Sequence, residues 1–205
     1  HYLILPPIGT WNSIKMKFEI IYFIYARFLR SSASVMLTRV TDSGHEILMG
    51  KRSSDLPAFP DLWSFPGGGV SSVDRKSAEV NPDWLPNKNK SRVATFTLLR
   101  EMVEEIGISP DGNGGFVEVE SDVRERVCED KSAWRKEVES GNISIEAFVC
   151  QVITDRVTPP QSPMRFHNLF FHVDMGFSKA EPSFPPCRSE FVEFRWWDPR
   201  EIISA

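Results

Sequence analysis

Three glutamates lie close together in the segment Arg100–Gly107, which reads Arg-Glu-Met-Val-Glu-Glu-Ile-Gly. In a helix, Glu101, Glu104 and Glu105 fall on one arc of the surface, because residues i, i+3 and i+4 are neighbours. Hard divalent cations such as Mg²⁺ or Mn²⁺ prefer carboxylate oxygens as ligands. The spacing therefore indicates a site for Mg²⁺ or Mn²⁺, although a solvated acidic face is the commoner use of three clustered glutamates.

A run of three glycines, Gly67, Gly68 and Gly69, precedes this helix and follows the short apolar segment 62–65. Glycine lets the backbone adopt conformations closed to other residues and approach a neighbouring helix closely. Exposed amides in such a turn can also receive a phosphate oxygen. Alone, a glycine triplet marks an ordinary turn, but ahead of the acidic helix it predicts that these glycines contact the substrate.

This combination resembles the Nudix hydrolase superfamily, whose box reads G-x5-E-x7-R-E-U-x-E-E-x-G-U, with U apolar. The second half is matched in full from Arg100 to Ile108. The first half is stretched, because Gly68 leads after five residues to Asp74, an acid where the family has Glu, and about 18 extra residues follow. The insertion leaves the carboxylate partner of Arg100 open between Asp74, Glu79 and neither.

Looser motifs resemble the coenzyme A and acyl-CoA diphosphatase-like branch of this superfamily, in which an insertion often splits the box. The segments that carry this likeness are Lys51–Ser53, Trp63–Gly68, Thr158–Pro159, Arg165–Phe166, Phe170–Phe171 and Trp197–Glu201. Two positions depart from the pattern: His167-Asn168 stands where the branch often has Asp, and Asp61 replaces a glycine. The resemblance implies an α/β (α+β) fold, a Nudix-type α/β/α sandwich with a mixed sheet and a helical insertion.

The resemblance also implies roles for the box residues. Glu101 and Glu105 are expected to bind the metal directly, and Glu104 to act as a ligand or as the base that takes a proton from water. Arg100 is expected to orient the acids through a salt bridge. We thus expect Glu104, Arg100 and Glu101 to serve catalysis, and Glu101, Glu104 and Glu105 to hold the metal.

Other candidates lie outside the box. Arg52 and Arg165 are predicted to bind substrate phosphates, although each suits an ordinary surface arginine equally well. Glu190 and Glu193 are candidates for a general base from another loop, with a solvated surface as the more common role.

The implied reaction is hydrolysis of a diphosphate linkage in a small nucleotide-containing substrate. Coenzyme A or acyl-CoA is the leading choice, giving 3′,5′-ADP and (acyl-)4′-phosphopantetheine. A nucleotide sugar, ADP-ribose or a dinucleotide is the alternative within the same chemistry. A noncatalytic Nudix-fold binding module is a second alternative, although such a module would tend to lose box acids. An isomerase on this scaffold would need a catalytic cysteine, for which no cysteine has a suitable context.

The composition sets limits on function. Of the 205 residues, 41% are hydrophobic and 25% charged, which is typical of a globular protein. A net charge of −4 argues against a nucleic-acid partner. Cys128, Cys150 and Cys187 are too far apart in sequence for a zinc motif or a disulfide framework. We expect a cytoplasmic protein with no membrane partner, and a homodimer is left open.

Hydrophobic periodicity predicts the elements that position the box. Strands are expected at 34–38, 46–50, 62–65, 168–173 and 191–197, and helices at 92–106, 119–139, 143–153 and from Pro199. Residues 1–30 are treated as an N-terminal extension, whose apolar stretch 18–29 is too short to span a membrane and is expected to pack as a strand or short helix. Residues 31–205 are expected to form a single domain, with insertions at about 71–91, a surface loop, and 116–157.

Overall fold

The computed structural model describes residues 29–81, 89–160, 162, 164–187 and 189–204. The predicted element at 18–29 lies, except for Leu29, outside these residues. Within them, no helix combines the length and the apolar character needed to cross a membrane.

A mixed seven-stranded sheet forms the centre of the described structure. Its strands are β1 (Arg30–Thr41), β2 (Gly44–Arg52), β3 (Trp63–Ser64), β4 (Gly67–Gly69), β7 (Gln151–Val157), β8 (Phe166–Asp174) and β9 (Phe191–Trp197). The order is β3-β2-β1-β8-β7, with β4 paired to β1 and β9 to β2. Only the β1–β8 pair among these is parallel. The predicted strands are thus confirmed, most of them with longer bounds.

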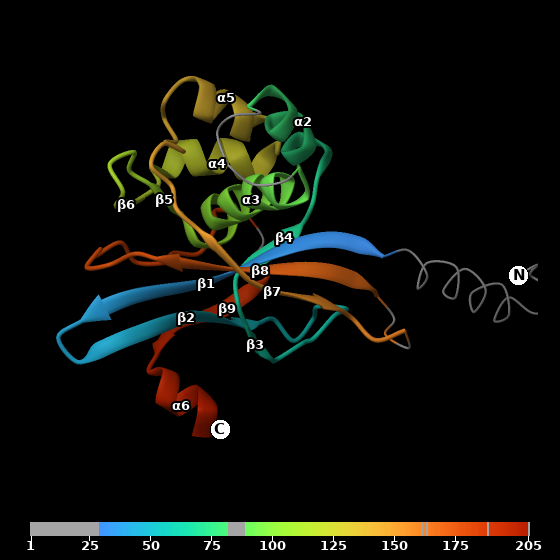
Figure 1. The fold of residues 1–205 in the computed structure, drawn as a ribbon, viewed down its shortest axis with the longest axis vertical. Coiled ribbons are helices and arrows are strands. Elements are labelled where there is room, and N and C mark those ends of the chain that lie inside the picture. The colour runs from blue at the N-terminus through green and yellow to red at the C-terminus, as the bar shows by residue number, and fades with distance from the viewer. Residues whose placement is uncertain (1–28, 82–88, 161, 163, 188, 205) are drawn as a thin grey trace, which may run out of the picture.

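Helices lie on both sides of this sheet. They are α2 (Ser72–Val80), α3 (Asn89–Glu101), the π-helical turn η2 (Met102–Ile106), α4 (Ser121–Glu129), α5 (Ala133–Glu139) and α6 (Pro199–Ser204). Helices α2 to α5 gather over one face and α6 lies on the other (Figure 1). A small second sheet pairs β5 (Ile108–Pro110) with β6 (Phe116–Glu118) beside the helices. The layers are those of the expected α/β/α sandwich.

The core lies between α3 and the central strands. Strand β1 alternates, so that Ala33, Val35 and Leu37 are buried, while Ser32 and Ser34 belong to the opposite face of the strand. The apolar side of α3 and η2 packs on the same core. Its buried members are Ala94, Leu98, Leu99, Met102, Val103 and Ile106. Because each fully buried side chain contributes about 1.5–3 kcal/mol, this packing fixes the height of the acidic helix above the sheet.

The insertion at 71–91 was predicted to be a surface loop, and this is wrong for Ser72–Val80 and for the residues from Asn89, which are helical. Residues 82–88 lie outside the described residues. Helix α2 occupies Ser72–Val80, and a capping box at Ser71 and Asp74 starts it. Ser77 and Ala78 are buried. This polar segment has little hydrophobic periodicity. It forms a helix because the capping box supplies hydrogen bonds at its first turn and because its small side chains can be buried.

The predicted helix at 143–153 is also wrong. Residues from Gln151 form strand β7, which pairs antiparallel with β8 at the edge of the sheet. Its residues include the β-branched Val152, Ile153 and Thr154, which suit a strand. In contrast, the helical prediction for 119–139 is confirmed as α4 and α5, with Val123, Val127 and Trp134 buried as expected.

Candidate active site

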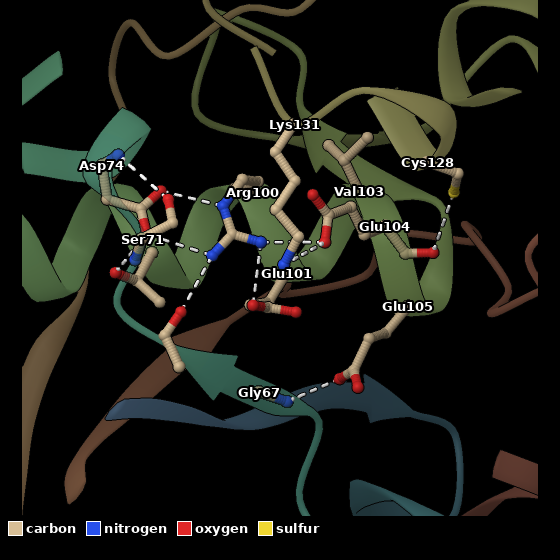
Figure 2. A network of polar contacts seen from close by, with 12 residues as sticks. Gly67, Ser71, Asp74, Arg100, Glu101, Val103, Glu104, Glu105, Cys128 and Lys131 are labelled. Atoms are coloured by element: carbon tan, nitrogen blue, oxygen red, sulfur yellow. Dashed lines mark hydrogen bonds and ion pairs between the residues drawn. The ribbon is translucent and has the colours of Figure 1, made fainter. Parts of the chain in front are cut away.

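Arg100 is the centre of the acidic cluster, and its side chain is fully buried. Its Nε and Nη2 donate to the two carboxylate oxygens of Asp74 at 2.8 and 3.0 Å. Its Nη1 lies 2.8 Å from Glu101 Oε1 and 2.8 Å from Glu104 Oε2 (Figure 2). A planar guanidinium can hold several carboxylates in fixed directions. The open choice of partner is thereby settled in favour of Asp74, which is fully buried, over the exposed Glu79.

Asp74 is held in place by the cap of α2 and by a side chain of α3. Its carboxylate accepts from the Ser71 backbone N–H at 2.7 Å and from Thr97 Oγ1 at 3.0 Å. Removal from water would raise the pKa of Asp74, but the hydrogen bond and positive charge of Arg100 outweigh it, so the pKa lies below its ordinary value of 3.8. Asp74 therefore stays ionised and fixes the orientation of Arg100.

The three glycines form strand β4 rather than a turn. Gly67, with φ +150°, would place a Cβ atom 2.2 Å from the Ala33 carbonyl oxygen, so a larger residue does not fit. The Gly67 N–H donates to Glu105 Oε2 at 2.7 Å. A Cβ atom on Gly68 would lie 2.3 Å from Glu101 Oε1. The expected close approach of glycine backbone to the acidic helix is confirmed.

Burial works against the ionised form of two acids in the cluster, Glu101 and Glu105. Removal from water raises the pKa of Glu101 to about 7, although the charge of Arg100 opposes the shift. Removal from water and the charge of Glu101 raise the pKa of Glu105 well above its ordinary value. Glu104 Oε1 is buried and has no hydrogen-bond partner in the described structure.

This donor set fits a divalent cation, because carboxylate oxygens that lack partners are the ligands hard cations prefer. Among the described residues, no three His, Cys, Asp or Glu side chains are already arranged around one point as metal ligands. Arg100 Nη1 holds Glu101 and Glu104 by one oxygen each, so the second oxygen of each carboxylate is the one that could turn to a metal.

A second buried arginine, Arg124 of α4, supports the end of the acidic helix. Its Nε donates to the Val103 carbonyl at 3.0 Å and its Nη2 to the Glu104 carbonyl at 3.1 Å. Gly107, with φ +69°, closes the turn through its N–H, as the sequence predicted. These contacts stabilise the π-helical turn η2, a feature that often accompanies functional sites. The sequence gives no signal for Arg124, which lies on a different helix.

A cavity of about 1240 Å³ opens beside the cluster, and all three box glutamates and all three glycines line it. Arg52 lines it as well, with its Nη2 3.3 Å from Glu190 Oε2. Lys131, which the sequence did not single out, lies 3.8 Å from Glu104. Arg165 and Glu193 are not among the lining residues. Arg165 instead contacts the Thr158 carbonyl at 3.5 Å.

Comparison with known proteins gives relatives of one kind. No protein-family model matches the chain. Nudix hydrolase 7 of Caenorhabditis elegans is 25% identical over 182 residues, which cover 85% of this chain and 53% of that protein. Acyl-coenzyme A diphosphatase NUDT19 of Xenopus laevis is 24% identical over 216 residues, which cover 79% of this chain and 55% of that protein. The chain thus spans about half the length of these curated relatives.

A solved structure shows the same fold. The crystal structure of a NUDIX hydrolase from Alicyclobacillus acidocaldarius superposes with a TM-score of 0.70 at 21% identity, over 86% of this chain and 82% of that one. The fold is therefore the Nudix fold, with a box helix facing a glycine strand. The two curated relatives and the box residues agree with this fold, and the chain is similar to the Nudix hydrolase superfamily in both respects.

Proposed function

We propose that this chain hydrolyses the diphosphate linkage of a small nucleotide-containing substrate with the help of Mg²⁺ or Mn²⁺. The observation that carries the proposal is the cluster of Glu101, Glu104 and Glu105, which lines a cavity of about 1240 Å³ and in which burial raises the pKa of Glu101 and of Glu105. A noncatalytic binding module would have no use for three carboxylates that destabilise the apo protein by mutual repulsion.

Glu101 and Glu105 are the proposed metal ligands, with Glu104 as a further ligand or as the base. A bound divalent cation supplies charge neutralisation of the diphosphate and lowers the pKa of water. Arg100 positions Glu101 and Glu104 and does not touch the substrate, since its N–H groups already contact protein oxygens.

The remaining chemistry belongs to side chains around the cluster. Water attacks one phosphorus in line, an oxygen–phosphorus bond forms, and the bridging oxygen leaves with the other phosphate-bearing half. Glu104, whose Oε1 is buried without a partner, takes the proton from the water if it is not a ligand. Arg52 and Lys131 line the cavity and balance the charge of the phosphates.

Coenzyme A or acyl-CoA is the proposed substrate, giving 3′,5′-ADP and (acyl-)4′-phosphopantetheine. The branch motifs and the name of the Xenopus laevis relative, acyl-coenzyme A diphosphatase, support this choice. The cavity volume of about 1240 Å³ exceeds the ~300–1,000 Å³ of common ligand pockets and suits an elongated molecule. The expected cytoplasmic location and the homodimer left open stay predictions.

The test is product analysis by mass spectrometry. The protein is incubated with Mg²⁺ or Mn²⁺ and a mixture of coenzyme A, acyl-CoA, ADP-ribose, UDP-glucose and diadenosine polyphosphate. We expect metal-dependent 3′,5′-ADP from the coenzyme A compounds. Cleavage of another member of the panel instead would overturn the substrate, and absence of any product would overturn the hydrolase in favour of a binding module.

A further inference from the structure

Three adjacent strands present a second polar surface inside the same cavity, and its β1 serines pair with the glycine strand that contacts the box acids. Ser32 of β1 and Arg156 of β7 are both register partners of Asn168 on β8. Register partners project to the same face of a sheet, and so do residues two positions along. The residues two positions before and after Asn168 therefore lie on the same face, where Phe166 pairs with Arg30 and Phe170 pairs with Ser34.

We define the nucleotide platform as Arg30, Ser32, Ser34, Arg156, Phe166, Asn168 and Phe170. All seven residues line the cavity. The opposite face of the same strands carries Ala33 and Leu169, which are buried in the core. The platform is thus the cavity-facing side of these three strands.

The side-chain oxygen of Asn168 receives no hydrogen bond from the described residues. Asn168 Nδ2 donates to Ser34 Oγ at 2.9 Å, which fixes the carboxamide. Its Oδ1 is buried and has no hydrogen-bond partner in the described structure. A buried polar atom without a partner is costly. Because Oδ1 itself is not exposed, a ligand N–H satisfies it after a small shift of the Asn168 side chain toward the cavity that it lines. An exocyclic amino group of a nucleobase is a donor of this kind.

Two aromatic rings flank this carboxamide. Phe166 and Phe170 lie two residues before and after Asn168 on the same face of β8, and Phe65 braces Phe170 edge-on with ring centroids 6.4 Å apart. Aromatic side chains on the face of a sheet can stack on a nucleobase of any kind. The pattern of ring, amide and ring suits a flat base with an amino group.

Two arginines, Arg30 and Arg156, give the nucleotide platform a positive charge. Neither Arg30 nor Arg156 makes an ion pair with a residue that the structure describes. Within the described part of the chain, Arg156 Nη1 donates to Thr154 Oγ1 and the Asp155 carbonyl, and to no carboxylate. The Asp155 carboxylate lies 2.7 Å from His167, and both residues alternate to the other face. Unpaired guanidinium groups of this kind recognise phosphate.

We infer that the nucleotide platform binds the base of the substrate and a phosphate monoester that is not part of the cleaved diphosphate. Asn168 accepts from the exocyclic amino group of adenine, Phe166 or Phe170 stacks on the ring, and Arg30 and Arg156 bind the extra phosphate. This inference rests on the proposed function and deepens it. A nucleotide half with a 3′-phosphate is then preferred to the same half without one.

The experiment measures binding without metal and without turnover. Isothermal titration calorimetry compares adenosine 3′,5′-bisphosphate with adenosine 5′-monophosphate on the intact chain. We expect the bisphosphate to bind about tenfold tighter, because it gains charge-assisted contacts. The double variant Arg30→Gln, Arg156→Gln should lose that difference and keep the affinity for the monophosphate. Arg165→Gln, a neighbouring arginine outside the cavity lining, should change neither affinity.

Asn168 is tested with a second pair of ligands. We expect wild-type protein to bind adenosine 5′-monophosphate about fivefold tighter than inosine 5′-monophosphate, whose base carries an oxo group in place of the amino group. Asn168→Leu should remove this preference while leaving the gain from the 3′-phosphate. A thermal melt of each variant verifies the fold.

The outcomes separate the two proposals. Equal affinity for bisphosphate and monophosphate in the wild type, no binding of the bisphosphate, or an unchanged preference in the double variant overturns the platform. Selective binding together with no hydrolysis of any diphosphate leaves the platform standing and overturns the proposed function. Hydrolysis without selective binding overturns the platform alone.

Discussion

Arg100 shows how a buried charge is kept in a small domain. Its side chain has no exposed surface, and its N–H groups contact oxygens of Asp74, Glu101, Glu104 and the Gly69 carbonyl instead of water. Burial of a charge is tolerated only where partners satisfy every donor, and loss of one partner leaves the charge uncompensated. The fold therefore depends on the acids that serve the site.

Asp74→Asn is expected to destabilise the protein by about 3–5 kcal/mol at neutral pH, because Arg100 loses the one fully buried carboxylate among its three acidic partners. Urea unfolding measures the change. Glu79→Gln on the same helix is the control, since Glu79 is exposed, and it should stay within about 0.5 kcal/mol of wild type. Equal effects of the two substitutions would contradict the central place of Asp74.

The stability gap between wild type and Asp74→Asn should depend on pH. The pKa of Asp74 in the folded protein lies below its ordinary value of 3.8, so its stabilising effect is present above that value and is lost as the pH falls through the folded-state pKa. We expect a constant gap between pH 7 and 5 that narrows only below about 4. A gap that closes near pH 6 would argue against an ionised, paired Asp74.

Glu105→Gln is expected to stabilise the metal-free protein. The raised pKa of Glu105 reflects removal from water and the charge of Glu101, and a neutral amide relieves both while its oxygen keeps the bond from Gly67. A thermal melt in EDTA should rise by about 2–4 °C per kcal/mol gained. A lower melting temperature than wild type would show that the carboxylates do not repel one another.

At the scale of elements, strand β4 and the box helix fit together through Gly67, which donates to Glu105, and through Gly68, which lies against Glu101. Gly68→Ala places a methyl group 2.3 Å from a carboxylate oxygen of Glu101, whereas a methyl group on Gly69 meets nothing within 4 Å. We expect Gly68→Ala to lower kcat/KM about 100-fold through displaced acids, with Gly69→Ala near wild type. Steady-state kinetics on the substrate found by mass spectrometry decide between them, and equal rates would contradict the close fit.

Elements with strong local patterns could be predicted from the sequence. Strand β9 has the predicted bounds, and the acidic helix ends at Gly107 as expected. Helix α2 and strand β7 could not be predicted correctly, because burial beneath a cap and pairing with β8 decided them. The cap of α2 is local but leaves no hydrophobic period, and β7 depends on pairing with β8 farther along the chain, so periodicity reports neither.

The site was predictable where its residues share one helix. Glu101, Glu104, Glu105 and Arg100 follow from spacing and resemblance alone. Arg124 and Lys131 come from α4 and the residues just after it, and only the fold brings them to the cluster. The sequence could propose Asp74 as the partner of Arg100 but could not choose it over Glu79, because both lie in the inserted helix α2.

For the whole molecule, one cavity is lined by groups of opposite charge. The box acids line it, and so do the two arginines of the nucleotide platform, whose Ser32 and Ser34 pair with the glycine strand beside those acids. A bound cation at the acids and a phosphate at the arginines would hold an elongated nucleotide substrate in one orientation. The polarity of the cavity thus links binding of the nucleotide half to placement of the diphosphate.

The central claim is that the acidic cluster hydrolyses a diphosphate with a divalent metal. The most direct measurement is the turnover of coenzyme A with and without Mg²⁺ by wild type, by the double variant Glu101→Gln, Glu105→Gln, and by Glu193→Gln as an acid outside the cavity lining. We predict metal-dependent turnover by wild type and Glu193→Gln, and at least a 100-fold loss in the folded double variant. Turnover at the wild-type rate by the double variant would contradict the account.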